Sequence, residues 1–116
     1  MTNKVIHEIT KTLINSPTTS TSEVFEALRI WGESIFGPGE PTRLIERAQE
    51  EMQELKDAVY EGWTDKAVEE AADVVIILTR VPGLWDAIVQ KMNKNFDREW
   101  VVRGDGTGYH IAQDGG

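Results

Sequence analysis

The chain has 116 residues, of which 40% are hydrophobic and 28% are charged, and it contains no cysteine. This length and balance are typical of one compact globular domain. The formal net charge of −8 repels nucleic acid and anionic membranes at long range, which excludes duplex nucleic acid as a favoured ligand. Without cysteine, the chain forms neither a disulfide framework nor a thiolate metal site.

Apolar residues are too scattered to suggest a membrane segment. No stretch approaches the roughly 20 consecutive apolar residues that span a bilayer. The N-terminal sequence MTNKVIHEITKTLINS mixes apolar with charged side chains and lacks the continuous hydrophobic core of a signal peptide. We therefore expect a cytoplasmic protein with no membrane partner.

Hydrophobic periodicity predicts five helices along the chain. The first spans about residues 4–15, and the Ser/Thr-rich segment 16–22 links it to the rest. The second begins after Ser22 and ends near Phe36, where the GPGEP sequence stops it. Its apolar face carries residues that recur at helical spacing, namely Val24, Leu28, Trp31 and Ile35.

The other three helices are predicted at about residues 43–61, 64–81 and 84–100. Thr42 is the expected N-cap of the first of these, and Pro82 interrupts the chain after the second. The segment after Trp100 has a Gly-rich turn between β-prone pieces. We expect this segment to form either a small hairpin or an ordered tail.

These elements predict an all-α fold with a four-helix-bundle-like core, an extra N-terminal helix and a short Gly-rich C-terminal tail. Residues 1–20 would form the N-terminal helix and linker, and residues 21–116 the helical domain. The helix at 64–81 should be central, because apolar residues run unbroken from Val74 to Leu78. Its apolar surface exceeds what one thin bundle hides, so we expect a homodimer or a dimer of dimers.

Carboxylates stand directly before that apolar run, where burial of an unpaired charge is costly. Glu70 and Asp73 are three residues apart and share a helical face that continues into Ile77. Glu51 and Glu54 form a second such pair on the preceding helix. A link of only two or three residues makes the two helices antiparallel neighbours, which places the two pairs at similar height.

Four carboxylates that converge with no Lys or Arg between them repel one another, and a hard divalent cation removes that penalty. Oxygen-only ligands suit Mg²⁺, for which Mn²⁺ can substitute. The alternative for each acidic pair is an ordinary solvated face. A di-iron carboxylate centre would need Glu-x-x-His on two helices, and neither His7 nor His110 follows an acid by three residues.

The segments EEMQE and EEAAD carry a resemblance to a known family. With Glu54 and Glu70 sixteen positions apart, they resemble the E-x-x-E…E-x-x-D signature of the MazG-like, all-α nucleoside triphosphate pyrophosphohydrolases. The resemblance covers roughly residues 23–110. It implies that the metal ligands are Glu51, Glu54, Glu70 and Asp73.

The segment KMNKNFDREW resembles the family's distal Lys…Asn…Arg segment, which implies substrate contacts for Lys91, Asn95 and Arg98. These three residues also fall within about 60° of one another on a helical wheel. Two cations and an amide on one face can grip phosphate oxygens, although a solvated basic face is the alternative. The link between Asp73 and Lys91, interrupted by VPG, is shorter than the family pattern leads us to expect.

The family resemblance implies hydrolysis of a (deoxy)nucleoside triphosphate to the monophosphate and pyrophosphate, as in nucleotide-pool housecleaning. Bound Mg²⁺ would neutralise the phosphates and orient the attacking water. Glu50 is the candidate base, Lys91 and Arg98 are the candidate catalytic cations, and Trp31 or Phe36 would stack on the base of the nucleotide. Core packing is the alternative for both aromatic residues.

Two further functions stay open at this stage. Another nucleotide pyrophosphohydrolase, such as a phosphoribosyl-ATP type, would share the same metal motif. A non-catalytic acidic helical interaction protein would explain the charge and the helices, but it would not need a divalent cation.

Overall fold

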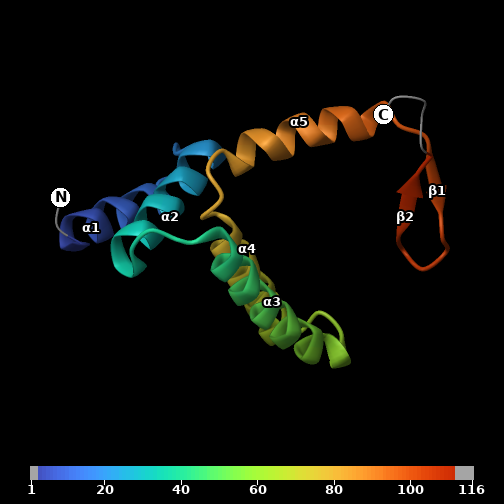
Figure 1. Cartoon of the computed structure of the whole chain (residues 1–116), viewed down its shortest axis with the longest axis horizontal. Coiled ribbons are helices and arrows are strands. Elements are labelled where there is room, and N and C mark those ends of the chain that lie inside the picture. The colour runs from blue at the N-terminus through green and yellow to red at the C-terminus, as the bar shows by residue number, and fades with distance from the viewer. Residues whose placement is uncertain (1–2, 112–116) are drawn as a thin grey trace. The chain divides into compact units, whose positions relative to one another are not determined.

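The computed structural model describes residues 3–111 and is mostly helical over that range (Figure 1). The elements are α1 (Asn3–Ile14), α2 (Thr21–Phe36), α3 (Pro41–Ala58), the 3₁₀-helix η1 (Val59–Glu61), α4 (Asp65–Leu78), α5 (Leu84–Phe96), β1 (Trp100–Val102) and β2 (Gly108–His110). The predicted mostly helical fold is therefore confirmed.

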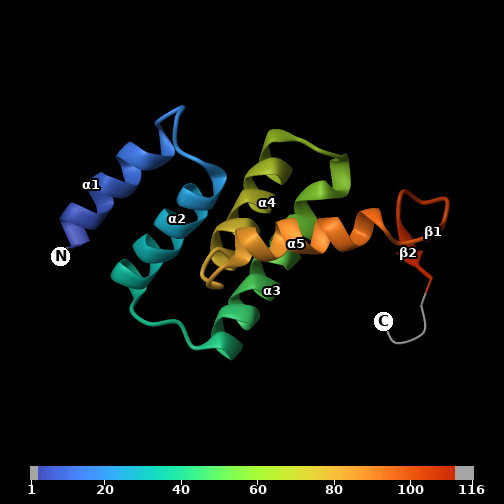
Figure 2. The ribbon, with the colours of Figure 1, turned by 90° about the horizontal axis from the view of Figure 1, so that it is seen from above.

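The chain divides into two compact units, one ending at Trp85 and the other beginning at Asp86. In the first unit, α1 packs along α2 and α3 packs along α4, as two helix pairs joined by the loop at residues 37–40 (Figure 2). The start of α5 contacts α2 where the rings of Phe25 and Trp85 lie 5.5 Å apart. The boundary predicted after residue 20 lies inside the first unit, within the connection from α1 to α2.

Side-chain caps determine where α2 and α3 begin. Ser20 and Glu23 form a reciprocal capping box, in which each side chain accepts the other residue's backbone N–H, so α2 starts slightly earlier than predicted. The predicted Thr42 cap of α3 is wrong. Glu40 takes that place, because its carboxylate accepts the backbone N–H groups of Thr42 and Arg43 at 3.1 and 3.0 Å. These two backbone hydrogen bonds lower the pKa of Glu40.

The second unit shows that the last helix is shorter than predicted. The chain leaves α5 at Phe96, and β1 pairs antiparallel with β2, with Trp100 opposite His110. The Trp100 indole N–H donates to the backbone carbonyl of Asn95 at 3.0 Å, which fixes the strand against the end of the helix. Of the two outcomes left open for the tail, the structure shows the hairpin over the described residues.

Burial around α4 is one-sided. Ala67 and Val74 of α4 are buried with Ala48 of α3, because the two helices approach closely through small residues. Val75, however, remains 48% exposed. The expectation that α4 is the central helix is therefore not met in the single chain, where one side of α4 stays exposed. Within the described part of the chain, no helix combines the length and apolar character needed to cross a membrane.

Candidate metal centre and adjoining cavity

Three of the four acids predicted as ligands come together between α3 and α4. Carboxylate oxygens of Glu51, Glu70 and Asp73, the acidic trio, all lie within 4.8 Å of one another. Opposite ligands of one Mg²⁺ are about 4.2 Å apart, twice the usual metal–oxygen distance. Neighbouring ligands of one octahedral Mg²⁺ are only about 3 Å apart, so the three oxygens would move closer together on binding one cation.

Two cationic side chains contact the acidic trio, which corrects the expectation that no Lys or Arg lies among these acids. Arg47 lies one turn before Glu51, and its Nη2 is 2.5 Å from Glu51 Oε1. Lys66 lies one turn before Glu70, and its Nζ is 2.6 Å from Glu70 Oε1. The hydrogen bond to Glu70 raises the pKa of Lys66. Both cationic side chains are more than half exposed, so each pair contributes little to stability.

The two glutamates of the trio keep one oxygen each without a partner. Their side chains are only 8% exposed, and the Oε2 atoms of Glu51 and Glu70 are buried without a hydrogen bond among the described residues. A buried, unsatisfied carboxylate oxygen carries a desolvation penalty, and such atoms are rare in native proteins. Oxygen donors of this kind are the ligands that Mg²⁺ and Mn²⁺ prefer, so the residues fit a divalent cation.

The remaining acids lie at the margin of the trio. Glu54 is exposed, yet a hydrogen bond with the Glu51 carboxyl, together with the negative charges of Glu51 and Glu70, raises the pKa of Glu54. It therefore shares the electrostatic field of the trio. The candidate base Glu50 points elsewhere, because it is exposed and pairs with Arg47 Nη1 at 3.1 Å.

A cavity of about 760 Å³ adjoins the trio, and Glu51 and Asp73 form part of its wall. Three arginines also line it, namely Arg43, Arg47 and Arg80. The cavity thus joins oxygen ligands for a cation to guanidinium groups suited to an anion. An ordinary solvated acidic face would not need a cavity that brings carboxylates and arginines together.

Aromatic side chains form another part of the cavity wall. Trp31 and Phe36 both line it, and their rings meet edge to face with centroids 6.1 Å apart. Trp31 is partly buried, and its indole N–H donates to His7 Nδ1 at 3.4 Å, while Phe36 is 72% exposed. The structure therefore places both predicted stacking residues beside the cavity, not in a closed core.

The three residues predicted to bind phosphate belong to the second unit. Arg98 Nη1 donates to Asn95 Oδ1 at 3.1 Å, so these two side chains come together, whereas Lys91 is exposed on α5. Arg98 lies beyond Phe96, where α5 ends, so the helical-wheel placement of Arg98 is wrong. A backbone turn from Arg98 N–H to the Asn95 carbonyl brings it back beside Asn95.

Sequence reasoning missed the cations of this site. Arg47 and Lys66 each precede their glutamate by four residues, which is the spacing of helical ion pairs, so a signal for them was present. Arg80 offered no local signal, because its partners lie more than forty residues earlier in the chain.

Comparison with known proteins finds no matching family model, no matching curated protein and no matching solved structure.

Proposed function

We propose that the protein is a Mg²⁺-dependent nucleoside triphosphate pyrophosphohydrolase of the MazG-like type. The observation that carries the proposal is the pair of buried, unpartnered oxygens of Glu51 and Glu70 beside Asp73. An acidic interaction surface would leave its carboxylates solvated, and it would have no reason to bury two of them at this cost.

In this proposal, Glu51, Glu70 and Asp73 hold the cation. Glu54, which lies at the margin of the trio, is the fourth proposed ligand. Bound Mg²⁺ supplies charge neutralisation for the phosphates and a polarised water for attack on phosphorus. Glu50 stays a proposed base only if its pairing with Arg47 opens, because that pairing now occupies its carboxylate.

The cavity supports a nucleotide as the ligand. Arg43 and Arg47 bring guanidinium groups to its wall, which would bind phosphate oxygens in exchange for their present glutamate partners. Trp31 presents an aromatic ring that suits a base. Lys91, Asn95 and Arg98 remain proposed phosphate contacts, as the family resemblance implies. Hydrolysis to the monophosphate and pyrophosphate, in nucleotide-pool housecleaning, is the reaction that the family resemblance implies for such a site.

A product assay tests the proposal directly. The purified chain is incubated with each common NTP and dNTP and with phosphoribosyl-ATP, in Mg²⁺ or in EDTA, and the products are identified. We expect a monophosphate and pyrophosphate from at least one substrate, and only with Mg²⁺. Release of inorganic phosphate and a diphosphate would indicate a different bond cleavage, and no turnover of any substrate would contradict the proposal.

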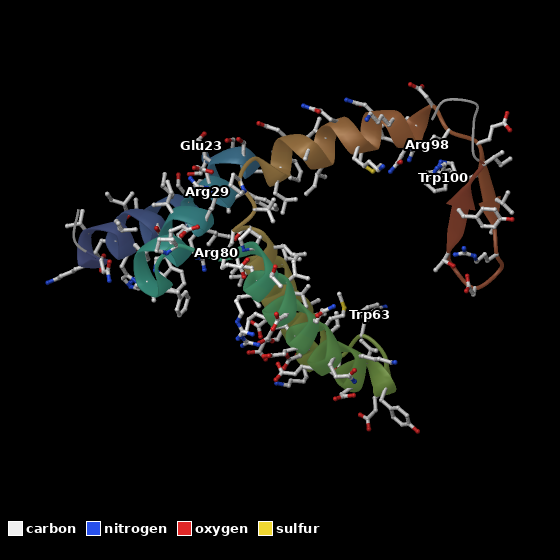
Figure 3. All side chains as sticks on the ribbon, in the orientation of Figure 1. Glu23, Arg29, Trp63, Arg80, Arg98 and Trp100 are labelled. Atoms are coloured by element: carbon white, nitrogen blue, oxygen red, sulfur yellow. The ribbon has the colours of Figure 1, made fainter. Side chains whose placement is uncertain are left out.

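Trp31 is expected to contribute to affinity for the base. Stacking on an aromatic side chain is worth about 1–3 kcal/mol per base, so Trp31→Ala should raise KM about tenfold while Trp31→Phe restores most of the affinity. Trp63→Ala is the matched control, since Trp63 is 76% exposed in the turn between α3 and α4 (Figure 3). Equal KM values for the two alanine variants would remove Trp31 from the site.

Self-association is expected to cover the exposed side of α4. Val75 is 48% exposed, and apolar surface of this kind favours burial against a second copy. We therefore propose a homodimer or a dimer of dimers, with a sedimentation mass of at least twice the 13.0 kDa of one chain. Val75→Glu should shift that mass toward the monomer, whereas Val102→Glu, at an 80% exposed hairpin position, should not. A wild-type mass near one chain at micromolar concentration would contradict this assembly.

A further inference from the structure

Arg80 connects the two helix pairs of the first unit. It lies two residues beyond the end of α4, and its side chain is only 9% exposed. Its Nη2 donates to the carbonyl of Gly37 at 2.8 Å and lies 3.2 Å from Glu33 Oε2. Arg80 is labelled in Figure 3. One nitrogen of the guanidinium therefore contacts both the end of α2 and the loop at residues 37–40 that follows it.

Glu33 completes this arrangement from the other side. Its Oε2 atom also accepts the backbone N–H of Gly39 at 3.3 Å. The Arg80–Glu33 ion pair thus holds the loop at two points, through the carbonyl of Gly37 and through the N–H of Gly39. These two backbone groups lie outside a helix and so have no helical hydrogen-bond partner, and the charged side chains supply one for each.

Two glycines make room for this ion pair, and a third permits the turn of the loop. A Cβ on Gly32 would lie 2.6 Å from Arg80 Cδ, and a Cβ on Gly39 would lie 3.0 Å from Arg80 Nη2 and 2.6 Å from Leu44 Cδ1. Gly37 has a φ of +83°, a conformation that other residues adopt only with strain. Glycine at positions 32 and 39 therefore leaves space for Arg80, and glycine at position 37 permits the turn whose carbonyl Arg80 binds.

The same groups border the cavity beside the acidic trio. Gly32, Gly37, Gly39 and Arg80 all line it. Arg80 follows Asp73 by seven residues in the chain, and as a cation without a side-chain oxygen it cannot be a metal ligand. Its Nε atom is buried without a hydrogen-bond partner in the described residues, a cost that a purely packing side chain would avoid.

We infer that Arg80 is a positioning residue, which together with Glu33 holds the 37–40 loop in the shape that the ligand cavity requires. Arg80 acts on affinity for the organic ligand through the loop, and it does not take part in holding the cation. The ligand part of this inference rests on the proposed function, whereas the loop part stands on the contacts alone.

The test compares Arg80→Lys with Glu33→Gln. Lysine keeps the charge but lacks the planar fork of donors, so it cannot reproduce the geometry of Arg80. Hydrogen exchange of a peptide covering residues 36–44 should become at least about tenfold faster at the loop amides in Arg80→Lys. Glu33→Gln keeps an oxygen acceptor and should show a smaller increase. Arg43→Lys, whose exposed side chain pairs with Glu46, is the control and should leave the loop exchange unchanged.

Binding and kinetics then separate positioning from general stability. In Arg80→Lys, the Kd for Mn²⁺ should stay within about twofold of wild type, while KM for the nucleotide rises about tenfold and kcat changes less than threefold. Unchanged loop exchange would overturn the inference. Uniformly faster exchange along α3 and α4 in both variants would also overturn it, because it would show a general structural role.

The two proposals fail in different ways. If the wild-type chain hydrolyses no nucleotide, the proposed function fails, and the loop exchange still decides whether Arg80 holds the loop. If the wild-type chain is active but Arg80→Lys keeps the wild-type KM, the proposed function stands and the positioning role fails.

Discussion

Replacement of Asp73 by Asn is expected to lower Mg²⁺-dependent kcat/KM by at least about a hundredfold. A metal ion contributes several kcal/mol of transition-state stabilisation, and each 1.36 kcal/mol corresponds to about a tenfold change in rate. Asparagine keeps the shape of the side chain but removes its charge, so the change acts on the cation and not on packing. Asp73 is exposed, so the melting temperature without metal should not fall.

Glu69→Gln provides a matched control for this variant. Glu69 is an exposed carboxylate on the same helix and stands outside the acidic trio. Its neutralisation changes the net charge by the same amount, so it should leave turnover within about threefold of wild type. Asp73→Asn with unchanged Mg²⁺-dependent turnover would remove the metal centre from the mechanism. Equal losses in both variants would point to the general charge of α4 as the cause.

The helices could be predicted from sequence because their apolar stripes recur at helical spacing, and the structure places helices at all five predicted segments among residues 3–111. Their ends were less predictable. Glu40 rather than Thr42 caps α3, because a glutamate side chain can also reach the first backbone N–H groups when proline occupies the next position. The last helix ends before Asp97 and Arg98, which form a turn. After this turn, the Trp100 indole N–H donates to the Asn95 carbonyl.

The acidic trio was predictable for a similar local reason. Residues three apart share a helical face, and a short link makes neighbouring helices antiparallel, so spacing alone brings Glu51 toward Glu70 and Asp73. The cavity was not predictable in this way. Its lining comes from α2, the loop at residues 37–40, α3, α4 and Arg80, and no periodicity records contacts between such distant segments as Arg80 and Glu33, 47 positions apart.

The burial of α4 shows the limit of pattern reasoning. An unbroken apolar run from Val74 to Leu78 predicts a surface that avoids water, but it does not say what covers that surface. In the single chain, α3 buries Val74 and leaves Val75 half exposed. The apolar run therefore leads us to expect a partner surface, and self-association stays a prediction for the oligomer measurement.

Divalent cations are expected to stabilise the wild-type chain strongly. A ligand at a hundred times its Kd adds about 2.7 kcal/mol to the free energy of unfolding, which corresponds to a rise of about 10 °C in Tm for a domain of roughly this size. The physical source is the removal of repulsion within the acidic trio and the satisfaction of the two buried Oε2 atoms. Thermal unfolding in EDTA, Mg²⁺ and Mn²⁺ measures the effect.

Two comparisons identify the cause of that stabilisation. NaCl at matched ionic strength should raise Tm by far less. Arg47 and Lys66 are exposed cations, so added salt screens their ion pairs with the trio and does not strengthen them. Asp73→Asn should lose most of the Mg²⁺ response, whereas Glu69→Gln should keep it. A shift of equal size in Asp73→Asn would show that the cation binds elsewhere on this acidic surface. No shift in wild type at millimolar Mg²⁺ or Mn²⁺ would mean that Arg47 and Lys66 already neutralise the trio, and that the buried carboxylates serve the fold alone.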